Sequence, residues 1–508
     1  MSNVAGLKTE KQSRTGRSDE NVGRARLGQG LPPVFVEIDR SSDHPLVDQI
    51  CSQIEEAADR GALAAGTKLP SVRKLAKQLG VSAFTAASAY ELLTTRHVVA
   101  ARRGAGYFVL QRGSVVPPPA RTPKATTVSD SWLSSDVFTH GRRFASPGCG
   151  WLPASWYSQK TVVGDALRRV ARSKTDHLVN YGQPAGFDRL RQHIARELSE
   201  RSLTVSPNQI VLTHGVTHAI DLVVRTCLRP GDAVLVENPG YANFNSLASR
   251  HGCKLLPVNR GAGGLDLDAA AELAETYRPK AMFVTTVLQN PLGTTLRPTD
   301  AFRLLSLAEQ FDFLVIEDDI ARRFGTDYDP WLAAMDGLSR VISVNGYSKT
   351  IAPSLRSGYL ACNDALAQEI LQTKMLTGLT TSEITERIVL EVLSDPNHRR
   401  SVDQISTRLT QAREAYRPVL EDAGLTLLTE PDGGMFLTAG WQVTPTETCN
   451  ARRIAEDALK EDTVLAPGDF FCVSPPETIW FRFNVAHQDT EQLQNFLRDV
   501  PKRYGFAG

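Results

Sequence analysis

The sequence has few cysteines and no closely spaced pair of them. Seven cysteines are spread over 508 residues, and no two of them form a CxxC pair. Closely spaced cysteines are typical of disulfide frameworks and metal sites, so we expect neither. Free thiols favour a reducing cytoplasm. No apolar run approaches the ~20 residues of a membrane helix. Residues 1–30 also lack the apolar core of a secretory signal.

Excess charge is also lacking, but the charges are unevenly distributed. The whole chain has a net charge of +1, whereas residues 1–112 contain 16 lysines and arginines against 11 acidic residues, and the remainder 41 against 45. A basic front segment is compatible with a polyanionic partner. The length predicts two or three domains. We expect a disordered tail at 1–33, a domain at 34–112, a linker with four prolines at 113–139, and a domain at 140–508.

The front domain has the pattern of a helix-turn-helix. In "PLVDQICSQIEEAADRGAL" apolar residues recur near helical spacing up to a glycine. "LPSVRKLAKQLG" and "VSAFTAASAYELLTTR" then predict two short helices, each with a serine at its start and a glycine turn between them. "VVAARRGAGYFVL" predicts a two-stranded wing with basic residues near its tip.

These segments resemble the winged-helix domain of GntR-type transcription regulators. The resemblance rests on "LPSVRKLA", "LGVS", "AYELL" and the wing "GAGYFV". It implies binding to double-stranded DNA through phosphate and base contacts from Ser71, Arg73, Ser82, Thr85, Tyr90 and Arg103. One departure is Ala83, where the family often has arginine. The alternative interpretation is a winged helix used for protein contacts.

In the rear domain, apolar strands alternate with helical segments. The strand-like runs are "QIVLTHG", "AVLVENPG", "AMFVTTVLQNP", "FLVIEDD" and "RVISVNGYSK". This alternation predicts an α/β domain with a mostly parallel sheet, in which ligands bind at the carboxyl ends of the strands. Polar residues gather at those ends.

Several of these residues have the chemistry of a cofactor site. Lys349 is an amine that can form a Schiff base with an aldehyde if its pKa is lowered. Asp318 can pair with a protonated pyridine nitrogen. Asn290 can donate to a ring hydroxyl, and Tyr241 offers a flat face for stacking. Any one of them alone would also suit a purely structural role.

Three further features suit anionic groups. The turn "THGVTH" leads into a helix, so the amides of Val216 and Thr217 would point at a phosphate. Arg356 would add a charge-assisted contact to that phosphate. Arg482 could hold a carboxylate in a bidentate manner.

The order of these motifs resembles fold-type I pyridoxal phosphate enzymes of the aminotransferase class. The resemblance is carried by "YGQPAGFDRLRQHIA", "NPGY", "QNPLG", "EDD", "SKTIAPSLRSGYL" and "FRFN", in that order. It implies pyridoxal 5'-phosphate as the cofactor, with Lys349 as the residue that binds it covalently. The chain departs from the family pattern at three places. Ile320 and Ala321 stand where a tyrosine is usual, Gly346 stands where a hydroxyl-bearing residue is often found, and Val216–Thr217 replaces a frequent serine–glutamine pair.

Joined in this order, the two domains resemble the MocR subfamily of bacterial regulators. The resemblance implies a cytoplasmic homodimer that binds paired DNA half-sites and senses the cofactor, or its adduct with a small amine or amino acid. One rival is a working aminotransferase with an accessory DNA-binding domain, which Arg482 favours and the missing tyrosine disfavours. Another is a regulator whose rear domain only dimerises.

Overall fold

The computed structural model describes residues 36–40, 45–60, 62–102, 105–110, 146–157, 160–173, 176–487 and 490–506. The chain divides into two compact units, Met1–Val128 and Ser129–Gly508. The expected tail at 1–33, the expected linker at 113–139 and Arg103 lie outside the described residues. None of the helices in the described ranges combines the length and apolarity needed to cross a membrane.

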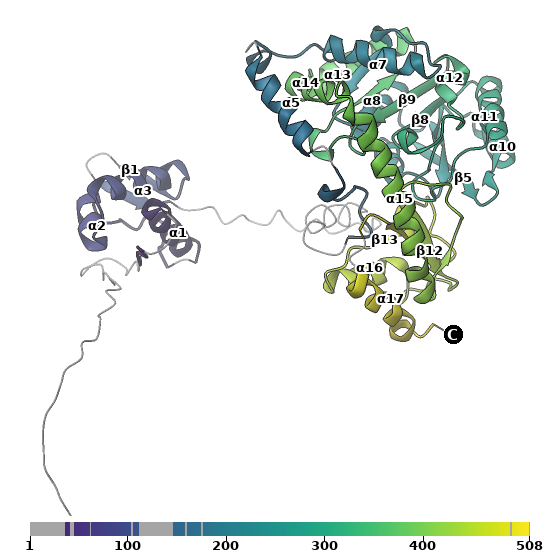
Figure 1. Ribbon diagram of the computed structural model, residues 1–508. Helices are drawn as coiled ribbons and strands as arrows, with labels where there is room; N and C mark the ends of the chain where they lie inside the picture. The colour runs from purple at the N-terminus through teal and green to yellow at the C-terminus, as the bar shows by residue number, and fades with distance from the viewer. Residues whose placement is uncertain are drawn as a thin grey trace, which may run out of the picture. The chain divides into compact units, whose positions relative to one another are not determined.

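The first unit is the predicted winged helix (Figure 1). Its elements are α1 (Leu46–Asp59), α2 (Val72–Leu79), α3 (Ala83–Thr95), β1 (Val99–Arg102) and β2 (Gly106–Val109). Ser71 caps α2 by accepting from the N–H of Lys74, and Ser82 caps α3 by accepting from the N–H of Thr85. Gly80 ends α2 with a φ of 62°, a left-handed conformation that favours glycine.

The core of this unit joins the three helices to the wing. Ile50 and Ile54 of α1 pack with Leu75 of α2 and Leu93 of α3, all of them buried. β1 and β2 pair as an antiparallel hairpin. The two helices of the helix-turn-helix are therefore held on one small apolar core, with their outer faces left exposed.

The second unit is built around an eight-stranded sheet with the order β3-β10-β9-β8-β7-β4-β5-β6. Its strands are β3 (Ile210–Thr213), β4 (Ala233–Asn238), β5 (Lys254–Gly261), β6 (Gly264–Leu265), β7 (Ala281–Thr285), β8 (Leu314–Asp318), β9 (Val341–Gly346) and β10 (Gly358–Ala361). β5, β4, β7, β8 and β9 are mutually parallel, whereas β10 runs antiparallel to both of its neighbours. The five predicted strands and the mostly parallel sheet are confirmed.

Helices cover both faces of this sheet (Figure 1). Successive side chains of a strand point to opposite faces, so Val315 of β8 packs in one apolar cluster and Ile316 in another. The covering helices are α5 (Lys160–Arg172), α7 (Asp188–Glu200), α8 (Val216–Cys227), α9 (Ala242–Arg250), α10 (Leu267–Tyr277), α11 (Pro298–Phe311), α12 (Leu332–Asp336), α13 (Asp364–Gly378) and α14 (Glu383–Leu393). The short helix α6 (Asp176–Val179) contacts α14.

A smaller antiparallel sheet completes the second unit. It has the order β11-β12-β14-β13, formed by Thr426–Leu427, Phe436–Trp441, Ile479–Asn484 and Ala466–Pro467. The long helix α15 (Asn397–Asp422) runs to it from the side of the large sheet, and α16 (Ala451–Lys460) and α17 (Thr490–Tyr504) lie beside it (Figure 1). Arg482 belongs to β14, so this sheet supplies one of the predicted site residues.

Candidate functional site

The predicted site residues of the second unit meet at the carboxyl end of the large sheet. Asp318 is the last residue of β8, and Lys349 lies three residues beyond β9. Asn290 follows β7, and Tyr241 follows β4. Because these strands are parallel neighbours, their ends bring residues that are distant in sequence to one edge.

Lys349 is half-buried, and its amine donates a hydrogen bond to the carbonyl of Gly150. Burial lowers the pKa of Lys349 from its ordinary 10.5 to about 8, and the positive charge of Arg482 contributes to this lowering. Asp318 acts in the opposite direction. A substantial fraction of this amine is therefore neutral near pH 8, which is the form that attacks a carbonyl carbon.

Asp318 is 4% exposed, and burial raises the pKa of its carboxyl group from 3.8 to about 7. The backbone N–H of Ile320 donates to its Oδ1 at 3.2 Å. Within the described part of the chain, no lysine or arginine forms an ion pair with it. A cationic ligand group placed against this carboxyl would favour its charged form.

A second feature of the site is an anion-binding corner at the start of α8. Gly215 precedes this helix with a φ of 79°, and no side chain caps the helix, which begins with Val216 and Thr217. Arg356 donates to the carbonyl of His214 at 3.2 Å. A Cβ at Gly215 would come within 3.0 Å of the guanidinium of Arg356, so glycine leaves the space that Arg356 occupies. The free amides and this cation together suit a phosphate.

Tyr241 interacts both with this corner, through Thr217, and with Asp318 at the end of β8. Its hydroxyl is hydrogen-bonded to Thr217 and accepts from Asn243 at 3.0 Å. Its ring stacks with that of Phe283 at a centroid distance of 6.2 Å. Burial raises the pKa of this phenol, and the nearby Asp318 raises it further.

Arg482 is 7% exposed and reaches into the site from β14. It donates to Asn290 Oδ1 at 2.9 Å and to the carbonyl of Gly148 at 2.7 Å. The guanidinium carbon lies 4.3 Å from the ring centre of Phe436 and 4.9 Å from that of Phe471. Its Nε is buried without a hydrogen-bond partner among the described residues. Burial lowers the pKa of Arg482 to about 10.

The bond to Asn290 also orients the amide of that residue. Because Oδ1 accepts from Arg482, the amide nitrogen is the group left to donate into the site. The sequence prediction gave Asn290 this donor role, and the geometry is compatible with it.

One segment of the site was missed by sequence reasoning. The backbone of residues 148–150 crosses the site, with the carbonyl of Gly148 on Arg482 and that of Gly150 on Lys349. Asn484 holds this segment by donating to the carbonyls of Cys149 and Trp151 at 3.1 and 2.8 Å. The only sequence signal for it was the pair of glycines in "PGCG".

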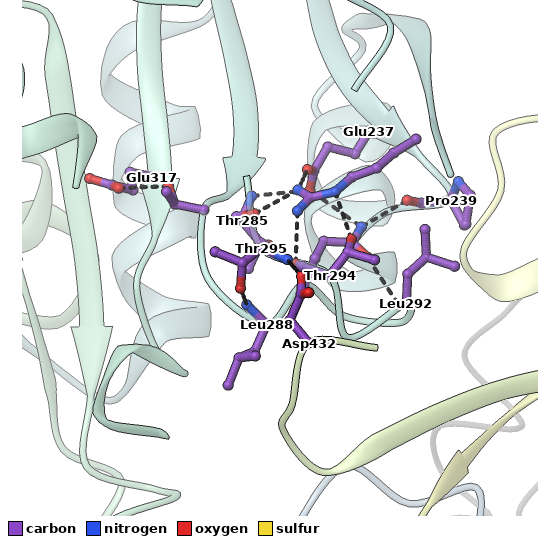
Figure 2. A network of polar contacts seen from close by, with 12 residues as sticks. Glu237, Pro239, Thr285, Leu288, Leu292, Thr294, Thr295, Glu317 and Asp432 are labelled. Atoms are coloured by element: carbon purple, nitrogen blue, oxygen red, sulfur yellow. Dashed lines mark hydrogen bonds and ion pairs between the residues drawn. The ribbon is translucent and has the colours of Figure 1, made fainter. Parts of the chain in front are cut away.

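A buried polar network behind the site was also missed (Figure 2). Arg260 and Glu237 form an ion pair, with side chains 1% and 0% exposed. Arg260 also donates to the carbonyls of Thr285 and Thr294 at 2.7 and 2.8 Å. Glu237 accepts from the N–H of Thr285 at 3.0 Å and from Gln289 at 3.4 Å.

This network holds the loop that carries Asn290 (Figure 2). Gln289 donates to the carbonyl of Pro239 at 2.8 Å and accepts from the N–H of Leu292 at 3.0 Å. Asp432, near the small sheet, accepts from the N–H of Thr295 at 2.6 Å. The loop is therefore fixed on both sides of Asn290.

The departures from the family pattern are visible in the structure. Ile320 and Ala321 are half-buried and supply no hydroxyl group beside Asp318. A Cβ at Gly346 would lie 3.4 Å from the side chain of Ile320 and 3.2 Å from the carbonyl of Ser357. The positions where the family usually has a tyrosine and a hydroxyl-bearing residue before the lysine are thus occupied by apolar side chains or by glycine.

In the first unit, most of the residues expected at DNA lie on the surface. Ser71, Arg73 and Ser82 are not buried, and Thr85 is half-buried. Tyr90 is placed differently, because it is fully buried in the core and its hydroxyl donates to the carbonyl of Pro70 at 2.8 Å. In this position Tyr90 supports the turn before α2 rather than facing solvent.

Comparison with known proteins identifies both units. Residues 155–500, more than half of the chain, match the family described as aminotransferase class I and II. The structure resembles α-aminoadipate aminotransferase LysN of Thermus thermophilus, solved with N-(5'-phosphopyridoxyl)-L-leucine, with a TM-score of 0.65, 25% identity and coverage of 72% of this chain and 93% of that one. The chain belongs to the aminotransferase class I and II family.

The front of the chain matches the bacterial regulatory proteins of the gntR family over residues 46–109. An HTH-type transcriptional regulator of Escherichia coli, YdcR, is 28% identical over 467 residues, covering 89% of this chain and 98% of the relative. The probable rhizopine catabolism regulatory protein MocR of Rhizobium meliloti is 28% identical over 396 residues, covering 75% and 76%. With both domains present in this order, the chain is a GntR-type regulator of the MocR subfamily, as its motifs predicted.

The residues present fit the pyridoxal phosphate that this family uses. Asp318 offers a buried carboxyl, the start of α8 with Arg356 offers an anion site, and Lys349 offers an amine whose pKa is lowered. The unpartnered Nε of Arg482 leaves a donor for a carboxylate.

Proposed function

We propose that the aminotransferase-like domain of this regulator binds pyridoxal 5'-phosphate and senses it, or its adduct with a small amine or amino acid. The observation that carries the proposal is the convergence of Lys349, Asp318 and Arg356 at one edge of the sheet. Lys349 would bind the aldehyde carbon, Asp318 the ring nitrogen, and Arg356 with the first turn of α8 the phosphate. The bound cofactor supplies an electrophilic carbon that exchanges one amine for another.

The contacts of residues 148–150 suggest how a ligand would be sensed. A ligand amine that competes for Lys349, or a carboxylate that competes for Arg482, must replace bonds to the carbonyls of Gly150 and Gly148. This segment follows in sequence the stretch that joins the two units. A ligand that favours one arrangement of the segment over another meets the thermodynamic requirement for allosteric control.

The proposal extends to the partner and to the assembly. The gntR-family domain supports binding to double-stranded DNA, and a homodimer would present two such domains to paired half-sites. We expect each domain to read one half-site, and the long connection between the units to free the half-site spacing from the usual rule.

A working aminotransferase remains the second candidate, favoured by the buried Arg482, which is suited to an amino acid carboxylate. Ile320 and Ala321 argue against it, because the hydroxyl that usually controls the cofactor from this position is missing. Turnover of an amino donor with a keto acid at an ordinary enzyme rate of ~1–1,000 per second would show that the domain is a working aminotransferase.

The proposal is tested by measuring DNA affinity with and without cofactor, while screening amines with and without a carboxylate. We expect the cofactor, or one class of amines in its presence, to change the affinity for a selected duplex. The same ligands should leave the DNA affinity of Lys349→Ala unchanged. An equal response of both proteins would show that sensing does not pass through Lys349.

A further inference from the structure

The outer face of α3 carries an exposed aromatic side chain and no cation. Phe84, the second residue of the helix, is 81% exposed, and Ala83 before it is also exposed. Between Ala83 and Thr95 the sequence contains no lysine or arginine. One exposed apolar side chain is not unusual by itself, so its position in the fold decides what it means. In a helix-turn-helix, the start of the second helix is the part that faces base edges in the major groove.

The cations of this unit lie around α3 instead of on it. Arg73, Lys74 and Lys77 are carried by α2. Lys68 and Arg102 lie over the ring of Phe108, at 5.9 and 4.7 Å from its centre. Cations on these flanking elements suit phosphate groups, which position a protein on DNA without reading its sequence.

The hydroxyl groups at the start of α3 are already used within the helix. Ser82 Oγ accepts from the N–H of Thr85 at 2.9 Å and is bonded to Thr85 Oγ1 at 2.8 Å. This leaves the methyl group of Ala83 and the ring of Phe84 as the groups that α3 presents to solvent in its first turn.

We propose that Phe84, together with Ala83, reads the C5-methyl groups of thymine in the major groove. The inference rests on the proposed DNA-binding function and makes it more specific. Guanine is read mainly by arginine or lysine, and adenine by asparagine or glutamine, whereas the thymine methyl is the apolar group that a major groove offers to alanine or phenylalanine. The operator half-site therefore has thymines where the first turn of α3 meets it.

The experiment removes only the methyl group. Duplexes that bind the full chain are selected from a random pool, and each thymine is then replaced singly by deoxyuridine. Burial of one methyl group predicts a loss of about four-fold in affinity at each contacted thymine. For Phe84→Ala, the ratio of thymine to deoxyuridine affinity should fall to about one at the thymines that Phe84 contacts and stay unchanged at any that Ala83 contacts. Phe84→Leu should keep most of the ratio at all of them.

Lys77→Ala is the matched control on α2. It should weaken binding to the thymine and deoxyuridine duplexes equally and lower the slope of log affinity against log salt by about one. Equal affinity of the wild-type chain for thymine and deoxyuridine duplexes would overturn the proposal. So would a thymine-to-deoxyuridine ratio that Phe84→Ala leaves unchanged. If no duplex binds even at low salt, the DNA-binding function itself fails, and this inference fails with it.

Discussion

The buried pair Glu237–Arg260 allows a quantitative prediction about the loop that carries Asn290. Replacing Arg260 with methionine leaves the carboxylate of Glu237 buried, with only Thr285 and Gln289 as donors. Removing one partner of a buried ion pair costs about 3–5 kcal/mol. We therefore expect Arg260→Met to lower the free energy of unfolding of the second unit by that amount near pH 8.

The pH dependence of this loss has a definite sign. Burial already raises the pKa of Glu237, and removal of the neighbouring cation raises it further. A raised pKa in the folded state means that stability is present at low pH and is lost as the pH rises through that pKa. The deficit of Arg260→Met should therefore be smaller at pH 5 than at pH 8.

Urea denaturation followed by tryptophan fluorescence measures this effect in the right unit. All six tryptophans lie beyond residue 128, within the second unit. The double variant Glu237→Gln with Arg260→Met contains no buried charge of the pair, so it should be more stable than Arg260→Met alone. A loss below about 1 kcal/mol for Arg260→Met, or a double variant less stable than the single one, would refute this account of the network.

Three further predictions concern the site itself. Arg356→Gly keeps the left-handed φ of 46° at this position acceptable. It should weaken cofactor binding roughly ten- to hundred-fold in equilibrium dialysis, since it removes a charge-assisted bond. Less than a two-fold change would count against the anion-binding corner. The rate at which the cofactor-free protein captures pyridoxal phosphate should rise with pH and level off above about 8, because Lys349 loses its proton there; a rate that still climbs near pH 10, as for an ordinary lysine, would contradict the lowered pKa. Arg482→Met should abolish the response of DNA affinity to amines that carry a carboxylate and spare the response to those without one; equal loss of both would show that Arg482 acts on the fold.

The sequence predicted those site residues that lie next to a readable strand end. Asp318 closes the apolar run "FLVIED", and Lys349 follows "RVISVNGYS", so parallel strands alone bring them to one edge. The winged helix was equally readable, because Ser71, Gly80 and Ser82 mark the ends of its two central helices.

What could not be predicted depends on contacts between distant segments. The carbonyl of Gly150 accepts a hydrogen bond from Lys349, which lies 199 positions later in the sequence. No local sequence pattern predicts a backbone contact of this kind. The pair Glu237–Arg260 left a fainter signal, since Glu237 interrupts the buried strand β4 and Arg260 occupies an inward-facing position of the alternating strand β5. Its formation depends on how β4 and β5 pair. The burial of Tyr90 was readable from the helical spacing of Ala86, Ala89, Tyr90 and Leu93.

The most direct test of the central proposal is the visible absorbance spectrum of the purified protein mixed with pyridoxal phosphate, before and after borohydride. Lys374→Met is the matched control, because Lys374 is also buried with a pKa lowered to about 8. It bonds instead to the carbonyl of Leu212 in β3, which lies three strands from β8 in the sheet. We predict a yellow band that borohydride abolishes, present in Lys374→Met and absent in Lys349→Ala. A protein that stays colourless with pyridoxal phosphate, or a band that survives in Lys349→Ala, would contradict the cofactor site described above.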